Sequence, residues 1–241
     1  MQIIQSNLLK QFSKLTQGFT TKDNGNIAFH VNDDKYKVIL NHKTLAEELK
    51  YDVNTLVHMK QIHSTLVKVV DVNDTFLNPP TCDALITNKK NVPLMVMVAD
   101  CSPLLFYDSK KEVIAVVHAG RAGAFGNIIQ TTLDSFTEDF DSHPDDIFVS
   151  IGASIKSCCY EVGEEVVQEA INLNLGFAIA KRKDSYYLNI SAILKEQLSN
   201  EHIPSKNIEF QNECTCCNNN KYFSYRVNKN DGRFAGIICL S

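Results

Sequence analysis

Three apolar runs follow one another so closely near the middle of this chain that they restrict its possible folds. They span residues 94–99, 104–107 and 113–118. Short runs of β-branched residues between turn residues are typical of buried strands. The links between these runs are too short for the crossover helix that parallel neighbours need, so we expect antiparallel pairs among them.

Other segments extend this pattern to an α/β fold. Further strands are predicted at residues 65–70, 84–87, 147–151 and 234–240, and helices at residues 43–50, 125–140, 163–172 and 191–200. The run 113–117, the helix from residue 125 and the run 147–151 look like one βαβ unit with a parallel pair of strands. We therefore predict a mixed β-sheet covered by helices on both faces.

The composition indicates an ordinary globular protein. The chain has 241 residues, 44% of them hydrophobic, and shows no internal repeat or linker, which predicts a single domain over residues 1–241. The net charge of −4 is weak and spread out, so it indicates no nucleic-acid or membrane partner. No association motif is evident, and we expect a monomer.

The start of the chain and its eight cysteines bear on its location. The first residues lack the basic and apolar regions of a signal peptide, and no apolar run approaches the roughly 20 residues of a membrane span. A chain of this size can bury a core without disulfide staples. We therefore expect free thiols in a reducing cytoplasm.

His63, Cys101 and His118 are the candidate metal ligands. Each stands where an apolar run begins or ends. Two imidazoles and one thiolate make three ligands for a borderline-soft metal, and an open fourth position is typical of catalytic zinc. The alternative is that each is an ordinary core or surface residue, because such wide intervals are not a signature of fixed spacing.

A glycine-rich segment directly follows His118. Small residues such as Gly120 and Gly123 let the backbone approach a ligand closely, and a helix N-terminus presents free N–H groups to an anion. Arg121 adds a positive fork suited to phosphate. The alternative is a tight turn that needs close packing of strand and helix.

Two carboxylates and a second arginine complete the set of candidate site residues. Asp83 and Asp100 each adjoin a strand-like run, where either one is a candidate to orient an imidazole or to act as a general acid or base. The alternative for both is a surface or turn carboxylate. Arg226 precedes the last strand and is a candidate to bind substrate or phosphate, or else to form a surface ion pair.

Cysteines also cluster in two short segments, Cys158-Cys159 and Cys214-Thr215-Cys216-Cys217. The second contains one Cys-x-x-Cys, whereas a zinc ribbon needs two such pairs. A thiol-rich loop is the simpler interpretation. A second metal site or a redox site is the alternative.

Seven segments in this order together resemble the YfiH family, also described as laccase-domain or polyphenol oxidase proteins. They are Gln61-Ile62-His63-Ser64, Cys82-Asp83-Ala84-Leu85-Ile86-Thr87, Ala99-Asp100-Cys101-Ser102-Pro103-Leu104, Val117-His118-Ala119-Gly120, Ile151-Gly152-Ala153, Cys158-Cys159-Tyr160-Glu161-Val162-Gly163, and Cys214-Thr215-Cys216-Cys217 through Phe223-Ser224-Tyr225-Arg226. The resemblance implies a single α/β sandwich with a mixed sheet. It also implies a metal bound by His63, Cys101 and His118. Members of the family are described as zinc-dependent purine nucleoside phosphorylases with adenosine deaminase side activity.

The chain departs from the family pattern at several positions. The family usually has His-Ala-Gly-Trp-Arg-Gly, whereas this chain has His118-Ala119-Gly120-Arg121-Ala122-Gly123 and no Trp. Arg121 is therefore displaced by one position. Lys22 stands where an arginine is common, and Cys82 replaces a glycine. These changes bear on the shape of the pocket and leave the metal ligands in place.

The leading hypothesis is a zinc-dependent purine nucleoside phosphorylase, which cleaves adenosine or inosine with phosphate to the free base and ribose 1-phosphate. Its partners would be the small-molecule nucleoside and phosphate. One alternative is a zinc hydrolase or adenosine deaminase with Asp100 or Asp83 as the proton carrier, although the chain has no His-x-Glu. Another is a non-enzymatic zinc-binding protein whose fourth coordination position is filled by a side chain.

A copper polyphenol oxidase is disfavoured by the ligand set. Multicopper oxidases use many histidines in His-x-His pairs, whereas this chain has seven histidines and no such pair. Copper binds nitrogen and sulfur ligands more tightly than zinc does, so it can still occupy the site adventitiously.

Overall fold

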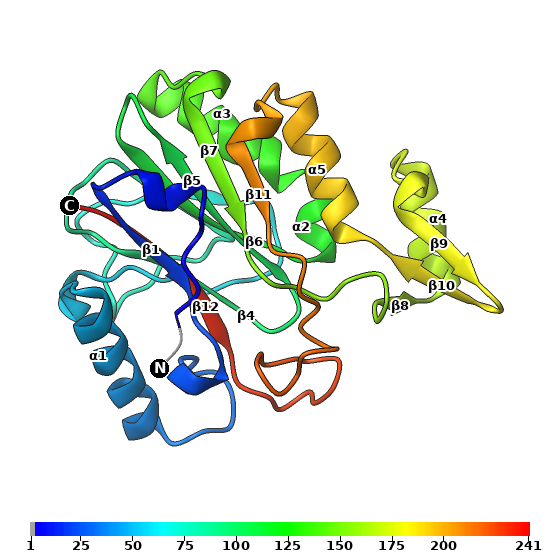
Figure 1. Cartoon of the computed structure of the whole chain (residues 1–241), viewed down its shortest axis with the longest axis horizontal. Helices are drawn as coiled ribbons and strands as arrows, with labels where there is room; N and C mark the ends of the chain where they lie inside the picture. Colours follow the sequence, from blue (N-terminus) through cyan, green and yellow to red (C-terminus); the bar gives the residue numbers. More distant parts are fainter. Residues whose placement is uncertain (1–2) are drawn as a thin grey trace.

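The centre of the molecule is a six-stranded mixed sheet with the strand order β11-β7-β5-β6-β3-β2. The computed structural model describes residues 3–241, and Figure 1 shows this sheet beside the helices. The two outer pairs, β2–β3 and β11–β7, are parallel, and the inner pairs are antiparallel. The strands are β2 Val67–Val69, β3 Ala84–Thr87, β5 Ser102–Asp108, β6 Val113–Ala119, β7 Ile147–Ile151 and β11 Ile208–Phe210. The mixed α/β fold is thereby confirmed.

A second sheet covers one face of the first. It has the antiparallel order β1-β12-β4, formed by Leu15–Phe19, Phe234–Leu240 and Leu94–Val98. Along β5, Leu104 and Phe106 pack towards the helices, while Leu105 and Tyr107 join the core between the two sheets. This alternation is the period of two expected of a strand that is buried on both faces.

The prediction of helices on both faces of the main sheet is wrong. Helices α2 (Arg121–Phe125), α3 (Ile128–Phe140) and α5 (Ile190–Asn200) cover one face, and the second sheet covers the other. Helix α1 (Lys35–Leu49) packs through Leu45 and Leu49 on the outer face of the second sheet. Figure 1 shows α1 beside β1, away from α3 and α5. The layers are therefore helix, sheet, sheet and helix.

The chain passes from one sheet to the other between β4 and β5. Strand β4 pairs with β12, whereas β5 pairs with β6 and β7. The antiparallel pair among the three central runs is therefore β5–β6, and β4 belongs to the other layer. Asp100 lies at the crossing with a φ of 85°, a left-handed conformation that is uncommon outside glycine.

The predicted βαβ unit is also corrected. Strands β6 and β7 run parallel, but they flank β5 instead of pairing with each other. The intervening helix is divided by Asn127, which has a φ of 60° and caps α3 by accepting a hydrogen bond from the Gln130 N–H.

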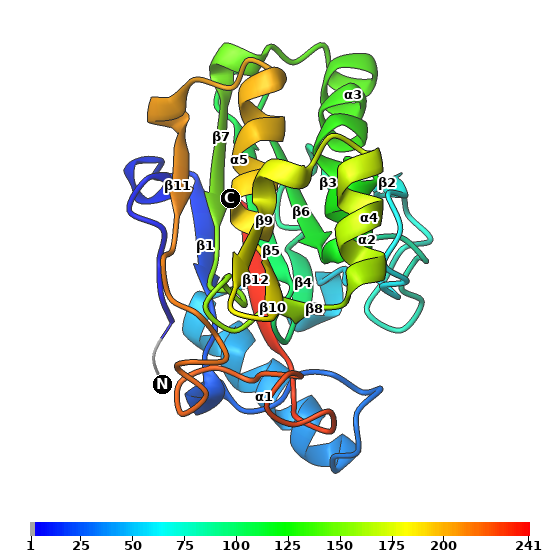
Figure 2. The same ribbon diagram turned by 90° about the vertical axis from the view of Figure 1, so that its right-hand side faces the viewer.

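The remaining elements lie at the periphery. Strands β8 (Glu161–Val162), β9 (Ile179–Arg182) and β10 (Ser185–Leu188) form a small antiparallel sheet, and helix α4 spans Glu164–Asn172. This unit lies at one end of the molecule in Figure 1 and faces the viewer in Figure 2. Within residues 3–241, no helix has the length and apolar character needed to cross a membrane.

Candidate metal centre and its pocket

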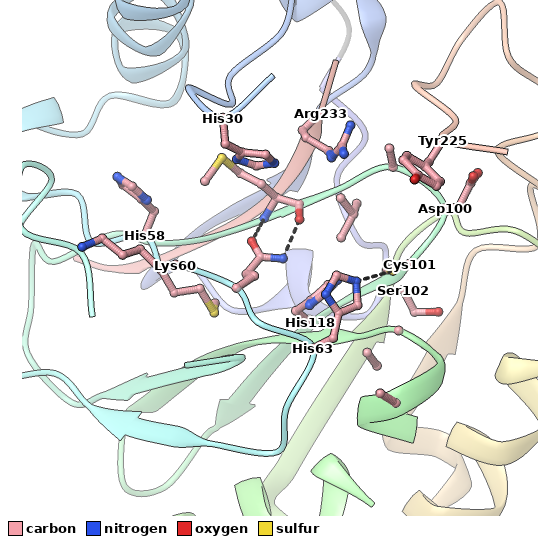
Figure 3. Close-up of a pocket in the computed structure, with 18 of the residues that line it drawn as sticks. His30, His58, Lys60, His63, Asp100, Cys101, Ser102, His118, Tyr225 and Arg233 are labelled. Carbon is pink, nitrogen blue, oxygen red and sulfur yellow. Dashed lines mark hydrogen bonds between the residues drawn. The ribbon is translucent and has the colours of Figure 1, made fainter. Parts of the chain in front are cut away.

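Three side chains from three different segments meet where the central strands end. Cys101 directly precedes β5, and His118 is the penultimate residue of β6, opposite Pro103 in the antiparallel register. His63 comes from the loop before β2. The thiol Sγ of Cys101 lies 3.9 Å from Nε2 of His63, and the ligand atoms of all three residues lie within 4.8 Å of one another. Figure 3 shows the two imidazoles facing Cys101. We call these three residues the pocket site.

The Asp83 carboxylate contacts both histidines of the pocket site. This fully buried group lies 2.8 Å from His118 Nδ1 and accepts hydrogen bonds from the backbone N–H groups of Ile62, His63 and Ser64. The Ser64 hydroxyl donates a further one. A carboxylate on Nδ1 directs Nε2 of His118 towards a metal, as in many zinc sites. The same contacts hold His63 at a φ of 59°, a backbone conformation that is uncommon for a residue with a side chain.

The electrostatics of the metal-free site favour a thiolate. Burial by itself raises the pKa of the Cys101 thiol, but His118 and His63 beside it lower that pKa to about 6. Burial lowers the pKa of His118, while the Cys101 thiolate and Asp83 raise it to about 9. Burial likewise raises the pKa of Asp83, and the hydrogen bonds from His118 and Ser64 lower it to about 2. A metal ion would thus meet a ready thiolate and displace a proton from His118.

Gly120 leaves room for the ligands. A Cβ atom built on this residue would lie 3.0 Å from Cys101 Sγ and 3.1 Å from Cδ2 of the His63 ring. Both distances are tighter than ordinary van der Waals contact. Gly120 has a φ of −83°, so the requirement is for space and not for unusual backbone geometry.

The pocket site opens into a large cavity of about 1190 Å³. Most ligand pockets in proteins fall between roughly 300 and 1,000 Å³. The walls carry apolar side chains, several polar groups, and the three arginines Arg121, Arg226 and Arg233. Within residues 3–241, the group of candidate ligands at the pocket site contains no fourth His, Cys, Asp or Glu. The three ligands therefore leave a coordination direction for a substrate or for water.

The structure places Asp100 next to Cys101 and engages both of its carboxylate oxygens in hydrogen bonds. One oxygen accepts a hydrogen bond from the Thr215 hydroxyl at 2.6 Å, and the other accepts one from the Arg226 backbone N–H, also at 2.6 Å. The Asp100 carbonyl accepts a hydrogen bond from Ile155 N–H. Asp100 thus ties the strand crossing to two loops that form the wall of the cavity.

Arg226 and Arg121 both line the cavity but are held in different ways. The guanidinium of Arg226 lies over the ring of Tyr160, 5.3 Å from its centroid, and donates a hydrogen bond to the Glu161 carbonyl. The guanidinium of Arg121 is paired with Glu169 on α4. The guanidinium of Arg226 therefore keeps further N–H donors beside the cavity, whereas that of Arg121 is engaged with a carboxylate.

The glycine-rich segment after His118 forms the five-residue helix α2. Gly120 lies at its N-cap and lines the cavity. A Cβ atom on Gly123 would lie 3.4 Å from the carbonyl oxygens of His118 and Ser64, and Gly123 does not line the cavity. For Gly123, close packing is the reason for glycine that the structure offers.

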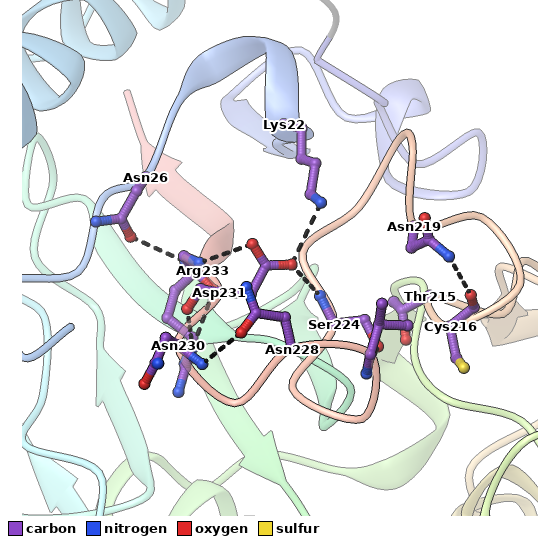
Figure 4. A network of polar contacts seen from close by, with 12 residues as sticks. Lys22, Asn26, Thr215, Cys216, Asn219, Ser224, Asn228, Asn230, Asp231 and Arg233 are labelled. Carbon is purple, nitrogen blue, oxygen red and sulfur yellow. Dashed lines mark hydrogen bonds and ion pairs between the residues drawn. The ribbon is translucent and has the colours of Figure 1, made fainter. Parts of the chain in front are cut away.

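Several cavity residues escaped the sequence analysis. Arg233 is anchored by its backbone N–H to Asn26 Oδ1 and by its guanidinium to the carbonyls of Asp231 and Gly232 (Figure 4). Lys22, noted earlier as a departure from the family pattern, forms an ion pair with Asp231 in the same network at 3.2 Å. These side chains meet across more than 200 positions of sequence, and no local pattern predicts such a contact.

Further residues of the cavity wall were also not anticipated. His30 and Tyr225 lie beside Arg233, as Figure 3 shows, and Tyr160 lines the cavity as well. Burial and the nearby charge of Arg233 lower the pKa of His30. The only sequence signal was that Tyr160 and Tyr225 stand within segments that resemble the YfiH family, whereas His30 lies outside the seven segments.

Comparisons with known proteins place the chain in a family. A family model described as multi-copper polyphenol oxidoreductase laccase matches residues 11–241. A purine nucleoside phosphorylase of Clostridium acetobutylicum is 34% identical over 224 residues, which cover 92% of this chain and 89% of that protein. Adenosine deaminase RL5, from an unknown prokaryotic organism, is 30% identical over 225 residues, covering 88% of this chain and 86% of that protein.

Solved structures agree with the sequence comparison. The hypothetical protein YfiH of Bacillus licheniformis superposes with a TM-score of 0.90 at 30% identity, covering 97% of this chain and 94% of that chain. YlmD of Geobacillus stearothermophilus superposes with a TM-score of 0.86 at 27% identity, covering 95% and 93%. The predicted resemblance is confirmed: this chain belongs to the YfiH family, the laccase-domain family whose model spans nearly its entire length.

Proposed function

We propose that this protein is a zinc-dependent purine nucleoside phosphorylase, which cleaves adenosine or inosine with phosphate to the free base and ribose 1-phosphate. The observation that carries the proposal is the joint lining of one cavity by the pocket site and by three arginines. The names of relatives support it, because the relative from Clostridium acetobutylicum is named a purine nucleoside phosphorylase.

The donor set of the pocket site fits zinc. A thiolate and two imidazoles are ligands that zinc accepts, and three protein ligands with an open position are typical of its catalytic sites. His63, Cys101 and His118 would hold the ion, and Asp83 would keep His118 in the tautomer that binds through Nε2. When bound, zinc would act as a Lewis acid towards an oxygen of the substrate or phosphate.

The arginines would bind and orient phosphate. Phosphorolysis brings a phosphate oxygen to the anomeric carbon while positive charge develops on the ribose and negative charge on the leaving base. A guanidinium offers a planar fork that matches phosphate geometry. Arg226 is held against Tyr160, and the Arg233 guanidinium lies 6.0 Å from the centroid of the Tyr225 ring. Both would meet the anion in a preset orientation, which lowers the entropic cost of binding it.

Other cavity residues would contact the nucleoside. The aromatic faces of Tyr160 and Phe29 and the apolar side chain of Ile155 suit a purine ring. The lowered pKa of His30 keeps this imidazole neutral near pH 7, so that it can both donate and accept a hydrogen bond at the edge of a base. Asp83 and Asp100 are already engaged with protein donors, and we assign them positioning roles.

The test is to incubate zinc-loaded protein with adenosine and with inosine, with and without phosphate, and to identify the products. Release of adenine or hypoxanthine that requires phosphate is the expected result. Arg226→Ala should raise the phosphate concentration needed for half-maximal rate, whereas Arg182→Ala should not. Arg182 is the matched control because it also lies over a tyrosine ring, Tyr187, but does not line the cavity. The absence of phosphate-dependent base release from any purine nucleoside would refute the proposal.

Adenosine deamination is the second candidate, favoured by the relative named adenosine deaminase RL5. It would yield inosine and ammonia at a rate independent of phosphate. The same incubation therefore separates the two reactions by product and by phosphate dependence.

A further inference from the structure

A second group of potential metal ligands lies outside the cavity. The thiols of Cys158, Cys159, Cys214 and Cys217 lie within 4.8 Å of one another, and all four are free. We call these residues the cysteine cluster. The Sγ atom of Cys217 is 3.5 Å from that of Cys158 and 3.3 Å from that of Cys159. Four thiolates around one zinc ion, with Zn–S near 2.3 Å, have sulfur atoms about 3.8 Å apart.

Two loops that are distant in sequence bring the cysteine cluster together. Ser154 and Cys214 form an isolated parallel bridge, and the Thr215 N–H donates to the Ser154 carbonyl at 3.2 Å. Cys158 and Cys159 follow in a turn closed by hydrogen bonds from Cys159 and Tyr160 to the Lys156 carbonyl. The backbone therefore positions both pairs of thiols independently of any bond between the sulfur atoms.

Backbone N–H groups surround the sulfur of Cys214, whereas burial raises the pKa of the Cys158 and Cys159 thiols. The backbone N–H of Lys156 donates to Cys214 Sγ at 3.4 Å, and the N–H of Cys217 also bonds to this sulfur. Backbone N–H donors of this kind stabilise thiolate ligands. The Asn219 side chain donates to the Cys216 carbonyl, as Figure 4 shows, and the Asn218 side chain donates to the Cys214 carbonyl. The Cys-x-x-Cys turn is thus fixed from both sides.

We propose that the cysteine cluster is a structural zinc site, closed by four thiolates and separate from the pocket site. Binding would remove one proton from each of the four thiols and form four Zn–S bonds, which leaves a net charge of −2. The positive charge of Lys156, near Cys214 and Cys158, partly offsets that charge. A closed set of four sulfur ligands leaves no coordination position for a substrate, so this zinc would join two loops and take no part in the reaction.

The first test is metal content. Protein purified under reducing conditions with zinc should contain about two zinc ions per chain, Cys217→Ser about one, and His118→Ala about one. Cys216→Ser is the matched control, because Cys216 lies in the same turn but outside the cysteine cluster, and it should retain both. Retention of both zinc ions in Cys217→Ser, or a single ion in the wild type that only His118→Ala removes, would overturn the proposal.

A second test uses the unmodified chain and does not depend on how a variant folds. Cys158 and Cys217 are exposed and should react rapidly with iodoacetamide as free thiols. In the zinc-loaded protein both should resist alkylation until a strong chelator is added, while Cys216 reacts at one rate throughout. Equal reactivity of Cys217 and Cys216 with zinc present would overturn the proposal. So would a disulfide between Cys217 and Cys158 or Cys159 in protein kept reduced.

Discussion

The pocket site and the cysteine cluster contain similar atoms in opposite settings. The pocket site has two imidazoles and one thiol at the ends of core strands, held by a fully buried carboxylate, and it faces a cavity of about 1190 Å³. The cysteine cluster has four thiols on two loops, two of them exposed, and none of them lines that cavity. Under the two proposals, the number of ligands and the space beside them distinguish a zinc ion that meets the substrate from one that only joins two loops.

The difference between the two sites is tested most strongly by removing one proposed ligand from each of them. His118→Ala should reduce kcat/KM by about a thousandfold, since it removes a proposed zinc ligand together with the imidazole partner of Asp83. His143→Ala, at an exposed position outside the cavity, is the control. Cys217→Ser should change kcat/KM by no more than about twofold, because Cys217 is exposed and does not line the cavity. Steady-state kinetics decide, and a comparable loss in both ligand variants would show that the sites act as one.

Replacing the Asp83 carboxylate tests whether zinc binding at the pocket site can be weakened without an effect on the cysteine cluster. Asp83→Asn should weaken zinc binding at the pocket site by roughly ten- to a hundredfold, the usual effect of removing such a partner, and leave zinc in the cysteine cluster. Competition with a chromogenic chelator measures both affinities. Asp108→Asn is the matched control: it too alters a buried carboxylate that accepts backbone N–H groups, but at the other end of β5. Equal zinc affinity in Asp83→Asn and the wild type would contradict the assigned role.

Low pH should lower the stability of the folded protein by protonating Asp83, which supports the pocket site. The folded pKa of Asp83, about 2, lies below its ordinary value of 3.8. Its contribution to stability is therefore complete above about pH 4 and is lost as the pH falls towards 2. This loss is about 2 kcal/mol, because one pKa unit corresponds to about 1.4 kcal/mol. Denaturant unfolding of metal-free protein at pH 4 and pH 2 measures it. The same pH dependence in Asp83→Asn would contradict the prediction.

The smallest expected effect concerns the space around the ligands. Gly120→Ala should weaken zinc binding by about fivefold or more, since the added methyl group would crowd Cys101 and His63 at a cost of about 1 kcal/mol. Gly176→Ala is the control, because its nearest neighbour would lie at an ordinary 3.6 Å. Zinc content of the cysteine cluster should be unaffected by either change. Unchanged zinc affinity in Gly120→Ala would show that the backbone around residue 120 shifts to accommodate the methyl group without a cost in binding free energy.

Local patterns predicted the elements whose burial is continuous. Strands β3, β7 and β12 coincide with the predicted ranges because nearly every residue in them is apolar. The second sheet was not predicted. Its edge strand β1 reads Leu-Thr-Gln-Gly-Phe, which carries little apolar signal, and it pairs with β12 across the whole length of the chain. Helix α1 begins eight residues before the predicted start, because Tyr36, Ile39 and Leu40 in its first turns are exposed and obscure the period.

The candidate site divides in the same way. The two histidines, Cys101 and both aspartates stand next to apolar runs, so the sequence marked them, and the structure brings all five to one end of the central strands. Arg233 and His30 reach the cavity through contacts between the two ends of the chain. Their positions depend on tertiary packing, which cannot be predicted from the spacing of residues in the sequence.

The crossing between the two sheets separates the residues of the pocket site from the residues that form the wall of the cavity. Cys101 is positioned by the two packed β-sheets, and His118 lies on the strand β6 next to β5. In contrast, Arg226, Tyr225 and His30 lie on segments without regular secondary structure. Substitutions in those segments can alter which molecule enters without moving the thiolate. Members of a family with this plan can therefore differ in the cavity wall while they share the strands that place Cys101 and His118.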